Sequence, residues 1–462
     1  MPNYAKDIEA QIDGLLSLDV PKQRPGAVHS FNKLTLPYQS NGQPVHCIEI
    51  HTGLDPTNTS IEAATIAPQP YEIGILLVGV DHGEEPQNGP SLVKAAQRLL
   101  AALLTIRSTS INLGMLPQTG APFDVLHPTD IKALNAYYAS KGFPTALKSP
   151  TIELSEIQAW FANLHIFMIP VVNRYGYDNH ERLNAHAVNI NRNYPVLWKG
   201  QRQGAANYYF NGKLPTTVSV TLGEAGATDY DITKAANETK NVIAAMRRRI
   251  TAFVDFHTGY GWIIQYPWSF QQTGVVGLNS WGDGADHPQM RYCNPGFGAT
   301  GWTWPAEPGK TPSYHEYMPQ ATYDNHLRAL AGMQQYLTPA SSLHPYWTGF
   351  GSQTVTGNSK LFTPSGAYTD LWQNSATPSD DPGGGESCDY FLSLDLCNAV
   401  AFNVECGGNS ATQLEVDCDL TLMVFGLLRQ MASWPTVGRL SSTSDADCDW
   451  TQDWQRAQRG CP

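Results

Sequence analysis

Two side chains that can bind a metal ion stand three residues apart in the segment DHGEE: His82 and Glu85. At this spacing both can face one point, as the ligands of a catalytic zinc ion must. His257, in the segment DFHTGYG, ends an apolar run and offers a second imidazole. Two histidines and one carboxylate leave the fourth zinc position open for water. We therefore predict one zinc ion on these three residues. The alternatives are a surface turn for the first pair and a core histidine for His257.

Glu405 lies in the strongly apolar segment AFNVECGG. A carboxylate is costly in such surroundings unless it is paired or has a function. Close to a zinc ion, it could take a proton from a water that the metal activates. The alternative is a buried glutamate that accepts hydrogen bonds from backbone amides.

Two arginines are weaker candidates. Arg192 stands among amides in NINRNYP, and its guanidinium could bind a carboxylate through two parallel hydrogen bonds. The alternative is a loop held by side-chain hydrogen bonds, and the local sequence favours it. Arg182, in HERLN, indicates nothing by itself.

Short apolar runs, typical of buried strands, alternate along the chain with segments of helical periodicity. The predicted strands are 72–81, 164–173, 250–257 and 398–406, and the predicted helices are 91–106, 231–249, 325–337 and 412–433. This alternation favours an α/β fold with a mixed, largely parallel central sheet and helices on both faces. Sites in such sheets lie beyond the carboxyl ends of the strands, where His82, His257 and Glu405 are found.

The chain shows no obvious linker. We predict an N-terminal extension at 1–40 with a short amphipathic helix, one catalytic domain at 41–435 and a cysteine-containing tail at 436–462. The long gaps between the candidate residues predict long loop insertions in that single domain. The formal net charge of −12 argues against nucleic acid as the main partner, and no apolar run is long enough to span a membrane.

Six of the eight cysteines lie after residue 387. Such crowding is typical of disulfides in an oxidising compartment, so we expect disulfide bonds and an extracytoplasmic location. The first residues do not resemble a signal peptide, which leaves the export route open and a cytoplasmic location as the alternative. Reduced, buried cysteines are the alternative to disulfides.

Together these segments resemble the zinc metallocarboxypeptidases of the carboxypeptidase A type, in a divergent bacterial-type branch. The resemblance runs discontinuously from about residue 71 to 431. The matching positions in chain order are His82 and Glu85, the turn at 171–177, Arg182, Asn191 and Arg192, His257, the segment 364–372, and Glu405. It implies a carboxypeptidase-like fold with a zinc site on the two histidines and Glu85.

The same resemblance implies roles for the remaining matched residues. Glu405 would be the general base and Arg182 the electrophilic arginine, while Asn191 and Arg192 would bind the carboxylate of a peptide. Thr369 falls at the floor of the specificity pocket, where it favours neither apolar nor basic side chains. By the same resemblance, the position of the family's substrate-capping tyrosine falls at Phe362, so a phenol would have to come from Tyr368 or Tyr260. Glu84 stands where the digestive enzymes carry arginine.

The implied activity is zinc-dependent hydrolysis of an amide bond, with removal of the C-terminal residue of a peptide as the first interpretation. The substrate would be a peptide or peptide-like molecule with a free carboxylate. One alternative is a carboxypeptidase-like amidase, deacylase or peptidoglycan stem-peptide hydrolase. An alternative of another class is a non-catalytic binding protein with a vestigial site, against which the complete set of candidate residues argues.

Overall fold

The structure is a computed structural model of the chain. It describes residues 2–18, 29–54, 73–113, 122–141, 147–194, 235–245, 250–259, 263–265, 328–329, 332–333, 335–336, 387–392, 399–408 and 411–433.

A seven-stranded mixed sheet forms the centre of the described chain, in the order β1-β2-β6-β3-β7-β9-β8. Its strands are β1 (His29–Thr35), β2 (His46–Leu54), β3 (Ile73–Gly79), β6 (Leu164–Ile169), β7 (Ile250–Gly259), β8 (Ile263–Gln265) and β9 (Val400–Gly408). The four central strands β6, β3, β7 and β9 are parallel, and the outer strands pair antiparallel. The predicted fold class is thus confirmed, and the four predicted strands correspond to the four parallel ones.

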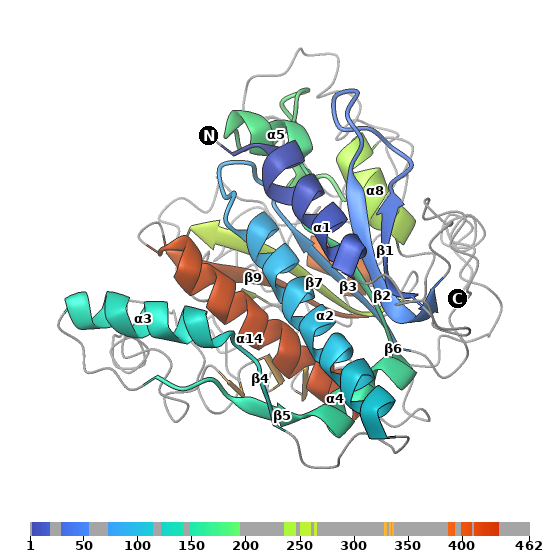
Figure 1. The fold of residues 1–462 in the computed structure, drawn as a ribbon. Helices are drawn as coiled ribbons and strands as arrows, with labels where there is room; N and C mark the ends of the chain where they lie inside the picture. The colour runs from blue at the N-terminus through green and yellow to red at the C-terminus, as the bar shows by residue number, and fades with distance from the viewer. Residues whose placement is uncertain are drawn as a thin grey trace, which may run out of the picture.

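One face of the sheet is covered by α1 (Ala10–Leu18), α2 (Asn88–Leu113), α4 (Leu154–Asn163) and α14 (Gln413–Ala432), which lie in front of it in Figure 1. Side chains from these helices and from alternate strand positions, such as Ile75, Val254 and Phe402, form one buried apolar cluster. On the other face, Phe391 of α13 (Ser387–Leu392) stacks on Phe253 of β7, with ring centroids 3.9 Å apart.

The helices predicted at 91–106, 231–249 and 412–433 are found as α2, α8 (Asn237–Ala245) and α14. Most of 325–337 lies outside the described residues.

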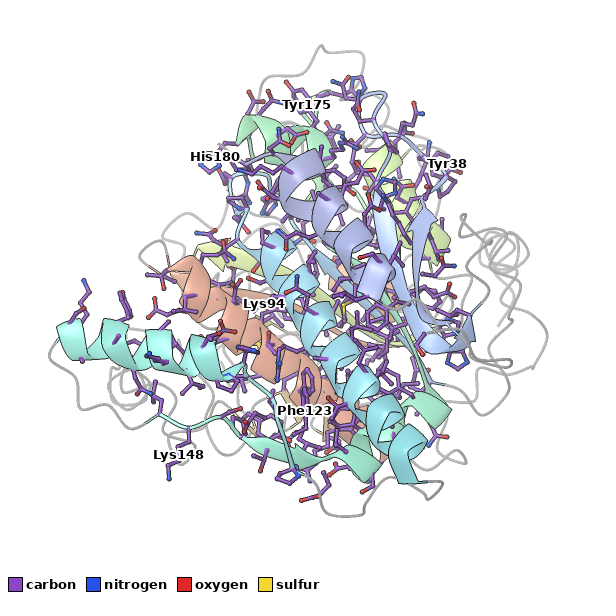
Figure 2. The ribbon with its side chains drawn as sticks, viewed as in Figure 1. Tyr38, Lys94, Phe123, Lys148, Tyr175 and His180 are labelled. Atoms are coloured by element: carbon purple, nitrogen blue, oxygen red, sulfur yellow. The ribbon has the colours of Figure 1, made fainter. Side chains whose placement is uncertain are left out.

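A small two-stranded sheet of β4 (Pro122–Asp124) and β5 (Thr151–Glu153), with α3 (Pro128–Ser140), packs against α2 and α14. Phe123, labelled in Figure 2, stacks on Phe425 of α14. The guanidinium carbon of Arg98 on α2 lies 4.7 Å from the centroid of the Phe123 ring. This insertion between α2 and α4 therefore extends the helical layer.

The N-terminal segment is a π-helical turn, η1 (Ala5–Glu9), that continues into α1. Tyr4, Ile8 and Ile12 are buried in the main core. The pairing of β1 with β2 crosses the boundary predicted at residue 40, and the tail predicted at 436–462 lies outside the described residues.

The expected disulfides are not found among the cysteines that the structure describes. No disulfide joins any two of Cys47, Cys388, Cys406 and Cys418. Cys406 lies on the core face of β9 and Cys418 on the buried side of α14, where both pack within the apolar cluster. Burial raises the pKa of each of these two thiols, which keeps them protonated. Cys293, Cys397, Cys448 and Cys461 lie outside the described residues.

Among the helices of the described chain, none combines the length and the apolar character that a membrane crossing requires.

Candidate metal centre and active site

The loop after β3 carries His82 and Glu85. It begins at Val80, whose φ of +57° is a left-handed conformation that β-branched residues rarely adopt. The N–H of Asn173, in the segment that follows β6, donates to the Val80 carbonyl over 3.0 Å, and this bond helps to hold the strained turn.

A contact between two backbones fixes the loop from the other side. A Cβ atom on Gly83 would lie 1.9 Å from the backbone carbon of Gly176, so only glycine fits at position 83. Gly176 belongs to α5 (Arg174–Asn179), which Asn173 caps by accepting from the Gly176 N–H. The Asn173 amide also donates to the carbonyls of Asp81 and Arg182. The turn predicted at 171–177 thus joins the loop to the segment that carries Arg182.

His257 and Glu405 come from neighbouring parallel strands. They are register partners on β7 and β9, one strand residue directly beside the other. Side chains alternate between the two faces of a strand, so both point away from the apolar cluster of the opposite face. Asp255 and Asn403, two residues earlier on each strand, share this face.

The side chains of His82, Glu85 and His257 converge. Their potential ligand atoms lie within 4.8 Å of one another, and all three side chains are buried. Glu85 Oε1 lies 2.9 Å from Nδ1 of His82, and Glu85 Oε2 lies 3.2 Å from Nδ1 of His257. The Thr258 N–H donates to Glu85 Oε2 over 3.0 Å.

The contact of His82 Nε2 with Asn189 indicates whether His82, Glu85 and His257 can hold a metal ion. Nε2 of His82 lies 3.0 Å from Oδ1 of Asn189, an acceptor, so the ring proton belongs on Nε2. The lone pair of Nδ1 then faces the Glu85 carboxylate at 2.9 Å, and a cation bound between these two acceptors would satisfy both. Two imidazoles and one carboxylate are a typical catalytic zinc set, so the residues fit zinc.

Charges around the site set the protonation of these ligands. Burial, with a contribution from Arg182, lowers the pKa of His82 to about 4. Burial by itself would raise the pKa of Glu85, but the two histidines outweigh it and hold that pKa well below its usual range. Burial would also lower the pKa of His257, but Asp255 and Glu85 outweigh it and raise that pKa. Glu85 and His82 are therefore ready to ligate, whereas His257 must release a proton when a metal binds.

Glu405 is held as an acid when no metal is bound. Its Oε2 atom is buried and has no hydrogen-bond partner among the described residues. Burial, followed by the negative charge of Glu85, raises the pKa of Glu405 to about 8. A cation bound between Glu85 and His257 would lower this pKa toward neutrality, into the range that suits a general base.

Arg182 lies at the exposed side of the group. Its Nη1 donates to Glu84 Oε1 over 2.9 Å and to Glu85 Oε1 over 3.5 Å. The guanidinium thus stands next to a candidate metal ligand.

The predicted substrate-binding residues are placed less completely. Asn191, in η2 (Ile190–Arg192), is buried; its Nδ2 lies 3.1 Å from Nε2 of His257 and its Oδ1 accepts from the Ser387 N–H. The backbone of Arg192 is described but its side chain is not, and Thr369 lies outside the described residues. The structure therefore brings together the three candidate metal ligands, Glu405, Arg182 and Asn191.

Two buried aspartates escaped the sequence analysis. Asp255 Oδ2 lies 3.2 Å from His257 Nε2, and Asp81 lies beside Asp255. Both Asp81 oxygens and Asp255 Oδ1 are buried without a hydrogen-bond donor among the described residues. Each aspartate interrupts an apolar run, the same signal that indicated Glu405.

Burial and the neighbouring Asp255 raise the pKa of Asp81 well above its ordinary 3.8. A raised pKa means that the folded state keeps a proton that the unfolded chain releases. This contribution to stability is complete below about pH 3.8 and is lost as the pH rises through the folded-state pKa. Asparagine cannot ionise, so the Asp81→Asn variant does not lose this stability as the pH rises. The substitution is therefore expected to raise the free energy of unfolding of the metal-free protein at pH 8 by about 1–3 kcal/mol. Urea unfolding in a chelator from pH 4 to pH 8 measures this, and a gain that does not grow with pH would contradict it.

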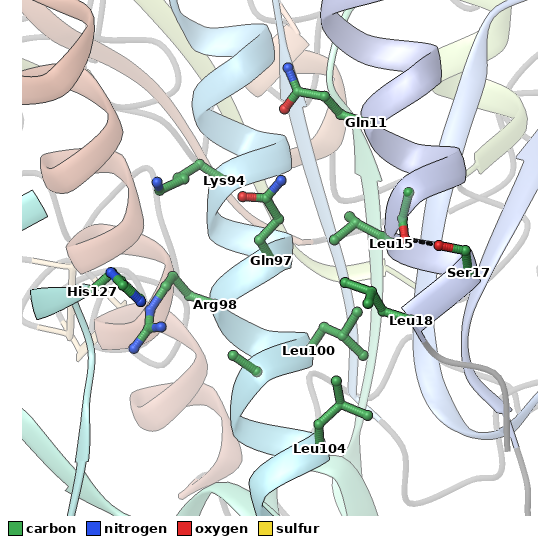
Figure 3. A pocket seen from close by; sticks show the side chains of 12 residues that line it. Gln11, Leu15, Ser17, Leu18, Lys94, Gln97, Arg98, Leu100, Leu104 and His127 are labelled. Carbon is green, nitrogen blue, oxygen red and sulfur yellow. Dashed lines mark hydrogen bonds between the residues drawn. The ribbon is translucent and has the colours of Figure 1, made fainter. Parts of the chain in front are cut away.

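A separate groove of about 530 Å³ lies between α1 and α2 (Figure 3). Leu15, Leu18 and Leu104 line it together with Lys94 and His127. None of the predicted site residues contributes to its lining, so it is distinct from the candidate active site.

A search among curated proteins found no match. Bovine thrombin-activatable fibrinolysis inhibitor, in complex with tick carboxypeptidase inhibitor, is similar in structure with a TM-score of 0.39 and 11% identity, over 93% of this chain and 96% of that one. A metallo-carboxypeptidase from Pseudomonas aeruginosa has a TM-score of 0.39 and 10% identity, over 91% of this chain and 68% of that one.

The family model of the zinc carboxypeptidases matches residues 151–391, which is 241 of the 462 residues. This range includes Arg182, Asn191 and His257. The chain belongs to the zinc carboxypeptidase family.

Proposed function

We propose that this protein is a zinc-dependent carboxypeptidase that removes the C-terminal residue from peptides. One observation carries the proposal: the buried nitrogens of His82 and His257 and the Glu85 carboxylate converge within 4.8 Å, with Glu405 directly beside His257 in the sheet. A general base next to a zinc site is the arrangement that metal-assisted amide hydrolysis requires.

His82, Glu85 and His257 would hold one zinc ion, which supplies a lowered pKa for an attacking water and polarisation of the scissile carbonyl. Glu405 takes the proton of the attacking water and passes it to the leaving amine. Its buried Oε2, without a partner among the described residues, supports this role because no hydrogen bond has to be broken before the proton moves.

Arg182 is proposed to stabilise the negative charge that develops on the scissile carbonyl oxygen. Its ion pair with Glu84 supports this role, because the bond limits where the guanidinium can go. The pair is accessible to a substrate, since 27% of the Arg182 side chain and 46% of the Glu84 side chain are exposed.

Arg192 is proposed to bind the free carboxylate of the substrate, and Thr369 to line its side-chain pocket. Asn191 is proposed to join Arg192 in this contact, although its amide also contacts His257 and Ser387 inside the protein. The proposed substrate is a peptide or a peptide-like molecule, and the proposed location is extracytoplasmic.

A matched pair of peptides with a free or an amidated C-terminus tests the exopeptidase proposal. The wild type is expected to cleave the free acid about 10–150-fold better in kcat/KM, since a charge-assisted contact contributes roughly 1.5–3 kcal/mol. Arg192→Ala should lower kcat/KM for the acid and leave the amide unchanged, which removes the preference.

Arg174→Ala is the control for this experiment. Arg174 donates to the Pro44 carbonyl and lies over the Tyr4 ring, so its loss should affect both substrates alike. Equal rates on acid and amide in the wild type would contradict the carboxypeptidase proposal.

Such a result would favour the second candidate, an amidase or peptidoglycan stem-peptide hydrolase on the same scaffold. One observation favours this candidate: the Asn191 side chain already lies between two buried groups, with its Nδ2 3.1 Å from His257 Nε2 and its Oδ1 accepting from the Ser387 N–H. A site that recognises no terminal carboxylate would not need that amide.

A further inference from the structure

The outer nitrogen of His257 faces a buried carboxylate. Nε2 lies 3.2 Å from Oδ2 of Asp255, and Asp255 has no exposed surface. The inner nitrogen, Nδ1, faces Glu85. One ring therefore connects the candidate metal site to a second polar layer behind it.

Ser387 organises this second layer. Its hydroxyl lies 2.6 Å from Asp255 Oδ2 and donates to it, while its backbone N–H donates to Asn191 Oδ1 over 3.0 Å. Ser387 is fully buried and comes from α13, 132 residues beyond Asp255. It thereby fixes both groups that touch Nε2 of His257.

The two groups act on Nε2 in opposite ways. The carboxylate of Asp255 accepts a hydrogen bond, so it favours the ring with its proton on Nε2 and a lone pair on Nδ1. The Ser387 N–H donates to the Asn191 amide oxygen, which therefore points toward Ser387 and away from His257. The Asn191 amide nitrogen, a donor, is then the atom that lies 3.1 Å from Nε2 of His257. Asn191 therefore cannot favour the zinc-binding form of the ring, and Asp255 must.

We propose that Asp255 and Ser387 are positioning residues of the metal site: Asp255 orients His257 with its Nδ1 lone pair toward the metal, and Ser387 holds Asp255 in place. The proposal rests on the proposed zinc enzyme and deepens it. A carboxylate behind a ligating histidine strengthens metal binding in many zinc proteins, and its removal typically costs 10–100-fold in affinity or activity.

The test is the Kd for zinc, measured by competition with a chelating dye on the purified full chain. Asp255→Asn is expected to raise the Kd about 10–100-fold. Ser387→Ala leaves the carboxylate in place and is expected to raise it about 2–10-fold. The visible spectrum of the cobalt-loaded protein, which reports ligand geometry, should change in the same two variants.

The chain offers a matched control in Ser40 and Glu238. Ser40 is a fully buried serine whose hydroxyl donates to the buried Glu238 carboxylate over 2.7 Å, and the second carboxylate oxygen accepts from Asn184. Ser40→Ala and Glu238→Gln should lower the free energy of unfolding by a similar amount and leave the zinc Kd and the cobalt spectrum unchanged.

The outcomes separate this proposal from the proposed function. A zinc Kd within about threefold of wild type in Asp255→Asn and within about twofold in Ser387→Ala would overturn the positioning role while the zinc enzyme stands. If Asp255→Asn does not fold, Ser387→Ala against Ser40→Ala decides alone. A wild type that binds no zinc would overturn both proposals.

Discussion

Glu405→Gln is expected to lower kcat by about 10²–10⁴-fold, the usual contribution of one catalytic proton-transfer group. The fold and the zinc content should stay, because Glu405 does not belong to the group of converging ligands. In the metal-free protein the pKa of Glu405 is about 8, so its carboxyl already carries a proton at neutral pH. Glutamine has nearly the shape of that protonated carboxyl and should fit the same site.

Steady-state kinetics with metal analysis of the same sample measures both effects. Glu238→Gln is the matched control, since Glu238 is a buried glutamate that bonds Ser40 and Asn184. Activity within about threefold of wild type in Glu405→Gln would show that the general base is a different residue.

His257→Ala is expected to lose most of the bound zinc, and activity with it. The substitution removes one of three protein ligands and leaves the Glu85 and Asp255 carboxylates facing an empty space. Its effect on the zinc Kd should exceed the 10–100-fold that is typical of residues behind the ligands. Metal analysis after dialysis against a buffered zinc concentration gives this value.

His165→Ala provides the matched control. His165 is fully buried on β6, and its Nε2 lies 2.8 Å from Glu49 Oε1. Its loss should destabilise the sheet but leave zinc binding intact. Full zinc occupancy in a His82→Ala, His257→Ala double variant would contradict the assignment of these ligands.

The parallel strands and the polar residues at their ends could be predicted from the sequence, because the signal is local. An apolar run that ends in a histidine or contains a carboxylate breaks the pattern of a buried strand, as at His82, His257 and Glu405. The order of these strands in the sheet and their register did not follow from such patterns. They depend on contacts between distant segments, such as His257 beside Glu405.

Two features were missed, each for its own physical reason. β1 and β2 carry buried polar side chains, Asn32, Glu49 and His51 among them, so their alternation does not read as a core strand. Ser387 has no distinguishing neighbours, and its role depends on a contact with Asp255, 132 residues away. The clustered cysteines favoured disulfides, although Cys406 lies on the same face of β9 as the core residues Phe402 and Val404. For Cys406, the alternation of side chains along the strand predicted its environment better than the clustering of cysteines did.

The most direct test of the central claim is a crystal structure of the zinc-loaded protein with anomalous data collected on both sides of the zinc absorption edge. The account predicts one strong zinc peak about 2.0–2.2 Å from Nδ1 of His82, Nδ1 of His257 and the Glu85 carboxylate. A zinc peak bound by other residues, or none at this position in zinc-saturated crystals, would contradict it.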